Sequence, residues 1–133
     1  MGNLFRGGLI IENGIQKLDL GKIKVEIVPR PEFESVKGFL FATIRPEDIL
    51  LSIEPFHSSA RNSFPGWIVN LQDRGGIIWV TMEPLSGFPY SKAELASTPF
   101  VAVITKRSQE EMGLKVGMQV YFTFKASCVN VFK

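Results

Sequence analysis

Short runs in which hydrophobic and polar residues alternate fill most of the chain, and glycines or prolines separate the runs. Ile23, Val25 and Ile27 alternate with charged residues, which is the period of a strand with one buried face. Such runs predict about ten short strands, over residues 4–11, 15–20, 22–27, 38–45, 49–53, 61–71, 77–82, 100–105, 119–125 and 129–132. The pattern therefore predicts an all-β fold.

Turn residues between the runs add local predictions. Asn13-Gly14 is typical of a two-residue hairpin turn, and Asp73 to Gly76 favours another tight turn. Gly7-Gly8 interrupts the first apolar run and predicts a bulge or a bend. Pro46 fits the first position of a single helical turn.

The pattern predicts little helix. Ser108, followed three residues later by Glu111, fits a capping box, and Gly113 is a typical stop, so this helix is about one turn long. Residues 91–96 favour a further turn or two of helix.

Short strands at regular spacing predict small five-stranded barrels of the oligonucleotide/oligosaccharide-binding (OB) type. We expect two lobes that share strands, with one short helix. Residues 54–59 are interpreted as a linker, so we expect one β subdomain at 1–56 and a second at 57–133.

Composition narrows the class of protein. Apolar residues make up 45% of the chain, which indicates a folded domain. A net charge of +2 is too balanced to indicate a nucleic-acid binder by itself. A single cysteine, Cys128, excludes an intrachain disulfide and favours a reducing compartment, so we expect a cytoplasmic protein. We expect no signal peptide, and no run approaches the ~20 apolar residues of a membrane span.

Enzyme motifs are absent from the sequence. It contains neither a GxxxxGK[ST] phosphate loop nor a GxSxG elbow. His57 is the one histidine and is expected to be solvated, while Cys128 is expected to be a buried, inert thiol. We therefore expect no catalysis, no metal and no cofactor in this part of the protein.

Three polar segments stand at the edges of predicted strands, namely 58–62, 105–108 and 125–127. Their hydroxyls, backbone N–H groups and cationic side chains have the chemistry to hold a small, doubly charged oxyanion. Ordinary turn and surface residues would give the same composition. The spacing alone leaves both interpretations open.

These segments, taken with their neighbouring residues, resemble those of a known family. The second half is similar to the molybdate-binding domains called Mop or TOBE, through Ser59-Ala60-Arg61-Asn62, Ile104 to Ser108, Glu111 to Leu114, Val116-Gly117 and Lys125-Ala126-Ser127. The first half is similar to the segment that precedes such a domain in importer ATP-binding subunits, through Asn3 to Gly7, Leu18 to Gly21 and Ile44 to Asp48.

This resemblance implies the C-terminal regulatory part of a molybdate or tungstate ABC importer ATPase, with 57–133 as the oxyanion-binding subdomain. It implies a homodimer that works with ATPase and permease subunits, with no nucleic acid and no membrane insertion. Molybdate or tungstate is the implied ligand. The implied contacts are Ser59, Ala60 and Arg61 in one segment, Thr105 and Ser108 in the next, and Lys125, Ala126 and Ser127 in the last.

Two alternatives are open at this point. Sugar importers share the signature at Ile44 to Asp48, so a ligand-free interaction module of a sugar-type importer ATPase is the first. A single-strand nucleic-acid binder is the second, because barrels of this class use exposed aromatic residues for stacking. The aromatic candidates are Trp67, Trp79, Tyr121 and Phe122.

Overall fold

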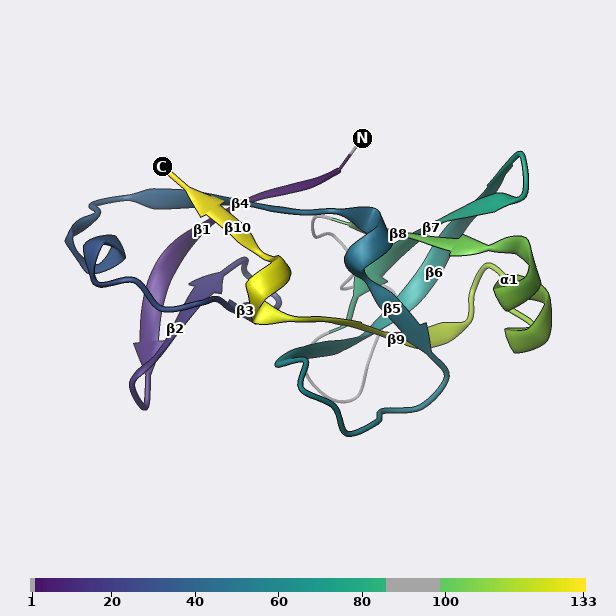
Figure 1. Ribbon diagram of the computed structural model, residues 1–133, viewed down its shortest axis with the longest axis horizontal. Helices are drawn as coiled ribbons and strands as arrows, with labels where there is room; N and C mark the ends of the chain where they lie inside the picture. Colours follow the sequence, from purple (N-terminus) through teal and green to yellow (C-terminus); the bar gives the residue numbers. More distant parts are fainter. Residues whose placement is uncertain (1, 86–98) are drawn as a thin grey trace.

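A computed structural model of the protein describes residues 2–85 and 99–133. All the predicted strands form, and they lie in two curled antiparallel sheets (Figure 1). The first sheet has the order β10-β4-β1-β2-β3 and the second the order β5-β9-β6-β7-β8. The all-β, OB-fold-like architecture with two lobes that share strands is thereby confirmed.

The elements have the following bounds. The first sheet consists of β1 (Asn3–Glu12), β2 (Ile15–Asp19), β3 (Lys24–Glu26), β4 (Phe39–Ile44) and β10 (Asn130–Phe132). The second sheet consists of β5 (Leu50–Ser52), β6 (Asn62–Arg74), β7 (Ile77–Pro84), β8 (Phe100–Thr105) and β9 (Gln119–Phe124). The helical segments are the 3₁₀ turns η1 (Pro31–Ser35), η2 (Pro46–Asp48) and η4 (Ala126–Cys128), and the α-helix α1 (Lys106–Met112).

The chain crosses between the sheets at η2 and at η4. The first crossover joins β4 to β5, and the second joins β9 to β10, so the last strand returns to the first sheet (Figure 1). Residues 54–59 do not link two halves. They connect β5 and β6, which belong to one sheet because both strands pair with β9. The division into 1–56 and 57–133 remains a prediction about function, and the sheets do not follow it.

The two sheets share one hydrophobic core. The ring of Phe5 in β1 stacks on Phe100 in β8, with 4.3 Å between the ring centroids. Buried amides add hydrogen bonds across the same boundary. Asn62 accepts from the Glu26 backbone N–H at 2.8 Å and donates to the Glu26 carbonyl at 2.9 Å. Asn3 does the same with Val101, at 2.6 and 2.9 Å. These contacts hold the lobes together as a strand ladder would.

Gly7 and Gly8 do not form the expected bulge, because β1 pairs with β2 and β4 without a break in register. A Cβ atom on Gly7 would lie 2.6 Å from the carbonyl oxygen of Asp19, whereas one on Gly8 would have no neighbour within 4 Å. The first glycine therefore allows the close approach of β1 and β2. The hairpin turn at Asn13-Gly14 is confirmed, with φ angles of 53° and 78°.

Gly7→Ala is expected to lower the free energy of unfolding by about 1–3 kcal/mol, the usual cost of overpacking against a backbone that cannot move freely. Gly8→Ala is the matched control and should stay within about 0.5 kcal/mol of the natural chain. Urea denaturation of both variants measures the difference. Equal losses would show that the close approach at Gly7 is not what selects glycine there.

Candidate functional site

A hollow of about 320 Å³ opens beside the two crossovers. Two of the predicted contact segments meet in it, because Ser59 and Ala60 line it together with Lys125. Its remaining lining residues come from η2, β5, the loop before β6, the end of β9 and η4, and they are Glu47, Asp48, Leu50, Ser58, Thr123, Phe124 and Cys128.

The pairing of β6 with β9 brings these segments together. Asn62 lies opposite Phe124, so the loop before β6 and the residue after β9 are neighbours. The Asn62 side chain is bonded to the first lobe, which fixes the point where that loop ends. On the floor of the hollow, the buried hydroxyl of Thr123 lies 3.0 Å from that of Ser63.

Charges in the hollow are mixed. Lys125 is exposed and forms no ion pair with any residue in the described part of the chain. Asp48 is held by Arg45, with Nε to Oδ2 at 3.0 Å and Nη2 to Oδ1 at 3.3 Å, and this hydrogen-bonded carboxylate raises the pKa of the Arg45 guanidinium. The carboxylate of Glu47 has no such partner within 2–85 and 99–133. A dianion would therefore meet one ammonium group and one uncompensated carboxylate.

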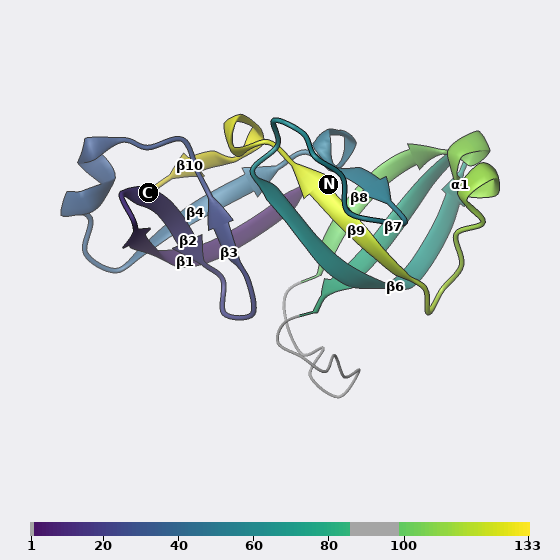
Figure 2. The ribbon, with the colours of Figure 1, turned by 90° about the horizontal axis from the view of Figure 1, so that it is seen from below.

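Thr105 and Ser108 lie at the opposite end of the second sheet. Thr105 pairs with Ile77, which pairs with Arg74 at the far end of β6, whereas Lys125 follows the partner of Asn62 at its start. At about 3.3 Å per residue the two ends of β6 are roughly 40 Å apart along the strand. Figures 1 and 2 both show α1 far from η4. One chain does not bring these residues into the hollow.

Thr105 caps the helix in place of Ser108, which corrects the predicted capping box. The Thr105 hydroxyl oxygen accepts from the Ser108 backbone N–H at 3.1 Å and donates to the Ser108 hydroxyl at 3.0 Å. The helix begins at Lys106 because the extended backbone of β8 ends at Thr105, which is itself a good capping residue. The predicted stop at Gly113 is confirmed by its left-handed conformation, with φ 63°. Residues 91–96 lie outside the described residues.

The other predicted contacts are more scattered. Ser127 lines a separate hollow of about 210 Å³ with Arg30 and Asn130, on the first lobe. Ala126 is half-buried in η4, and Arg61 is exposed beside the loop, and neither lines one of these hollows.

Sequence reasoning missed two parts of the site. Cys128 is half-buried and lines the 320 Å³ hollow, so the expectation of a buried thiol is wrong. In the sequence Glu47 and Asp48 belong only to the resemblance at Ile44 to Asp48, because nothing there shows that β5 pairs with β9 beside Lys125. Phe122 is fully buried, which removes it from any stacking surface for nucleic acid.

The family model of the TOBE domain matches residues 92–131 of the chain. The predicted resemblance to TOBE domains is confirmed.

Two curated importer ATP-binding proteins are similar in sequence to this chain. The chain is 34% identical over 98 residues to the molybdate/tungstate import ATP-binding protein WtpC of Pyrococcus abyssi, covering 74% of this chain and 25% of the relative. It is 33% identical over 115 residues to WtpC of Pyrococcus horikoshii, covering 86% of this chain and 29% of that protein. The chain therefore spans between a quarter and three tenths of the length of these relatives.

A solved structure has the same fold. The cytoplasmic molybdate-binding protein ModG, with molybdate bound, superposes with a TM-score of 0.77 at 22% identity, over 98% of this chain and 94% of ModG. This likeness shows that the TOBE match lies within a fold shared by nearly the whole chain. In the described part of the chain, no helix has the length and apolar character needed to cross a bilayer.

Proposed function

We propose that this chain binds molybdate or tungstate and is the cytoplasmic regulatory part of an importer ATPase. The observation that carries the proposal is the convergence of Ser59, Ala60 and Lys125 on one hollow, from segments far apart in the sequence. Two relatives of the chain are named as molybdate/tungstate import ATP-binding proteins, and this supports the choice of ligand.

The chemistry of the hollow suits a tetrahedral oxyanion. Lys125 supplies a charge-assisted donor, and the Ser58 and Ser59 hydroxyls lie on the same rim. Ser58 already accepts from the Ala60 backbone N–H at 3.2 Å, which leaves its hydroxyl proton available for the anion. These donors select an anion by its charge and shape. Molybdate and tungstate have the same charge and shape, so we expect similar affinity for both.

A second copy of the chain completes the site in this proposal. Its Thr105 and Ser108 would approach the hollow from outside, together with Lys106 and Arg107 of the same turn, which are exposed and ion-paired with Asp73 and Glu111 respectively. The Ser108 hydroxyl accepts from Thr105 and keeps its own proton for the anion. In a twofold-symmetric dimer each hollow receives one such turn, so the dimer holds two anions.

Regulation follows if the anion binds one dimer arrangement more tightly than another, because only a difference in affinity shifts the populations. The bound anion would then hold the importer in the arrangement that it favours and so adjust transport to the internal supply of the anion.

Isothermal titration calorimetry of the purified chain with molybdate, tungstate and sulfate, in phosphate-free buffer, tests the proposal. We expect saturable binding of molybdate and tungstate, with one anion per chain and little heat from sulfate. No heat with any of the three anions, from a folded and dimeric protein, would contradict the proposal and favour a ligand-free interaction module.

Glu47→Gln is expected to tighten anion binding by about two- to threefold, because it removes a like charge from a solvent-exposed rim, where Coulomb energies are small. The gain should shrink as salt is raised. The same titration at two ionic strengths measures it, with Glu32→Gln on the exposed η1 turn as the control. Weaker binding in Glu47→Gln would show that this carboxylate helps to hold the anion and does not oppose it.

A further inference from the structure

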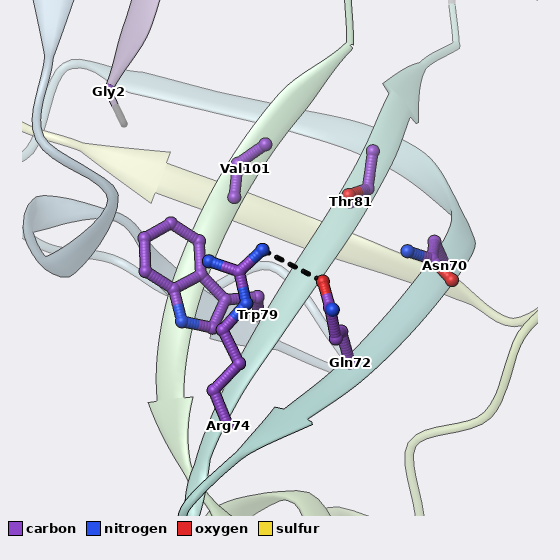
Figure 3. Close-up of a pocket in the computed structure, with 7 residues that line it drawn as sticks. All are labelled: Gly2, Asn70, Gln72, Arg74, Trp79, Thr81 and Val101. Carbon is purple, nitrogen blue, oxygen red and sulfur yellow. Dashed lines mark hydrogen bonds between the residues drawn. The ribbon is translucent and has the colours of Figure 1, made fainter.

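A second kind of site lies on the outer face of the second sheet (Figure 3). This hollow has a volume of about 160 Å³ and receives side chains from three neighbouring strands. Its lining residues are Asn70, Gln72 and Arg74 of β6, Trp79 and Thr81 of β7, Val101 of β8, and Gly2. The antiparallel register places them on one face, since Gln72 pairs with Trp79 and Thr81 pairs with both Asn70 and Val101.

Arg74 is held in place by two contacts. Its guanidinium carbon lies 4.5 Å from the centre of the Trp79 ring, and its Nη2 donates to Oε1 of Gln72 at 2.9 Å. Figure 3 shows the guanidinium lying across the indole, with its terminal end toward Val101. A cation that is ordered in this way loses little side-chain entropy when a ligand binds.

No carboxylate neutralises Arg74 within the described ranges 2–85 and 99–133. The adjacent acid, Asp73, accepts instead from Lys106 at 3.2 Å and from the Gly76 backbone N–H at 2.9 Å. These two bonds lower the pKa of Asp73, with the Gly76 hydrogen bond as the larger cause, so this acid stays ionised and engaged. The guanidinium of Arg74 is therefore available to pair with an anionic ligand.

The rest of the hollow is amphipathic. Trp79 and Val101 are half-buried and supply an apolar wall. The amide of Asn70 and the hydroxyl of Thr81 line the same space, and neither side chain bonds to another residue that the structure describes. At about 30 Å³ per water molecule the volume equals roughly five waters, well below a site for a drug-sized ligand. It has room for one ring or a short aliphatic chain.

We propose that this hollow binds a small monocarboxylate with an apolar body. The carboxylate accepts from the guanidinium of Arg74, whose planar fork matches a planar carboxylate. The apolar body lies against Trp79 and Val101. A tetrahedral dianion fits this hollow less well, because it offers a single cation and a largely apolar wall. This hollow shares no lining residue with the 320 Å³ hollow, although Arg74 and Thr105 both pair with Ile77.

Benzoate is a probe of suitable size, and benzamide is its uncharged analogue. We would titrate each into the full ¹⁵N-labelled chain and follow the Trp79 indole N–H and the backbone N–H groups of Thr81 and Val101 by NMR. We expect saturable shifts at these positions with benzoate and at least tenfold weaker binding of benzamide.

Arg74→Gln should weaken benzoate binding at least tenfold while the remaining spectrum stays that of the folded chain. Arg6→Gln is the matched control, because the Arg6 guanidinium lies over Phe39 at 4.7 Å on the other sheet, and it should leave binding unchanged. The absence of shifts at Trp79 with benzoate would overturn the inference, and so would equal benzoate affinity in Arg74→Gln and the natural chain.

Discussion

Lys125→Ala is expected to weaken molybdate or tungstate binding by about 1.5–3 kcal/mol, the range for a hydrogen bond to a charged group, or roughly 12- to 160-fold in Kd. Lys125 is the one ammonium group among the described residues that line the 320 Å³ hollow, and in the proposed function its partner there is the anion. Because Lys125 is exposed and unpaired in the described structure, its removal should leave stability nearly unchanged. Calorimetric titration and a urea melt measure the two quantities.

Lys37→Ala is the control for this loss, since Lys37 is also exposed but lies on the first lobe. It removes the same net charge and should change the anion affinity little. If Lys125→Ala bound the anion as tightly as Lys37→Ala does, Lys125 would have no place in the site.

Asn62→Ala is expected to lower the free energy of unfolding by about 2–4 kcal/mol, because it removes two hydrogen bonds and leaves the Glu26 backbone groups without their partner. Asn62 is 1% exposed and connects β6 to the first lobe. The loop that carries Ser59 ends at this residue, so the loss should extend to anion binding. Chemical denaturation of the variant gives the stability change.

Asn70→Ala provides the matched comparison in the same strand, because the Asn70 side chain is exposed and bonds to no described residue. It should change stability by no more than about 0.5 kcal/mol. Similar losses in the two variants would mean that the bonds between Asn62 and Glu26 do not contribute to joining the lobes.

Much of the fold could be predicted from the sequence because strand periodicity is a local property. The alternation through Ile23, Val25 and Ile27 and the glycine turns place strands and hairpins correctly. Which strands pair is not local. β5 and β10 have three residues each, too few to carry a pattern that selects a partner, and each crosses to the sheet of the other half.

The site shows the same division. The chemistry of Ser59 and Lys125 could be inferred from residue types and from the resemblance, and the register of β6 with β9 makes them neighbours. The distance to Thr105 depends on the length and pairing of β6, which the sequence does not reveal. The predicted cap at Ser108 is wrong because Thr105 and Ser108 are both good capping residues, and the end of β8 decides between them.

Anomalous diffraction at the tungsten edge, from crystals of the full chain grown with tungstate, is the most direct test of the proposed function. We predict a peak in the 320 Å³ hollow, within hydrogen-bond distance of Lys125 Nζ and the Ser59 hydroxyl, with the Thr105–Ser108 turn of a second copy on its open side. Tungsten peaks found only away from Lys125, or none at a saturating concentration, would contradict the account.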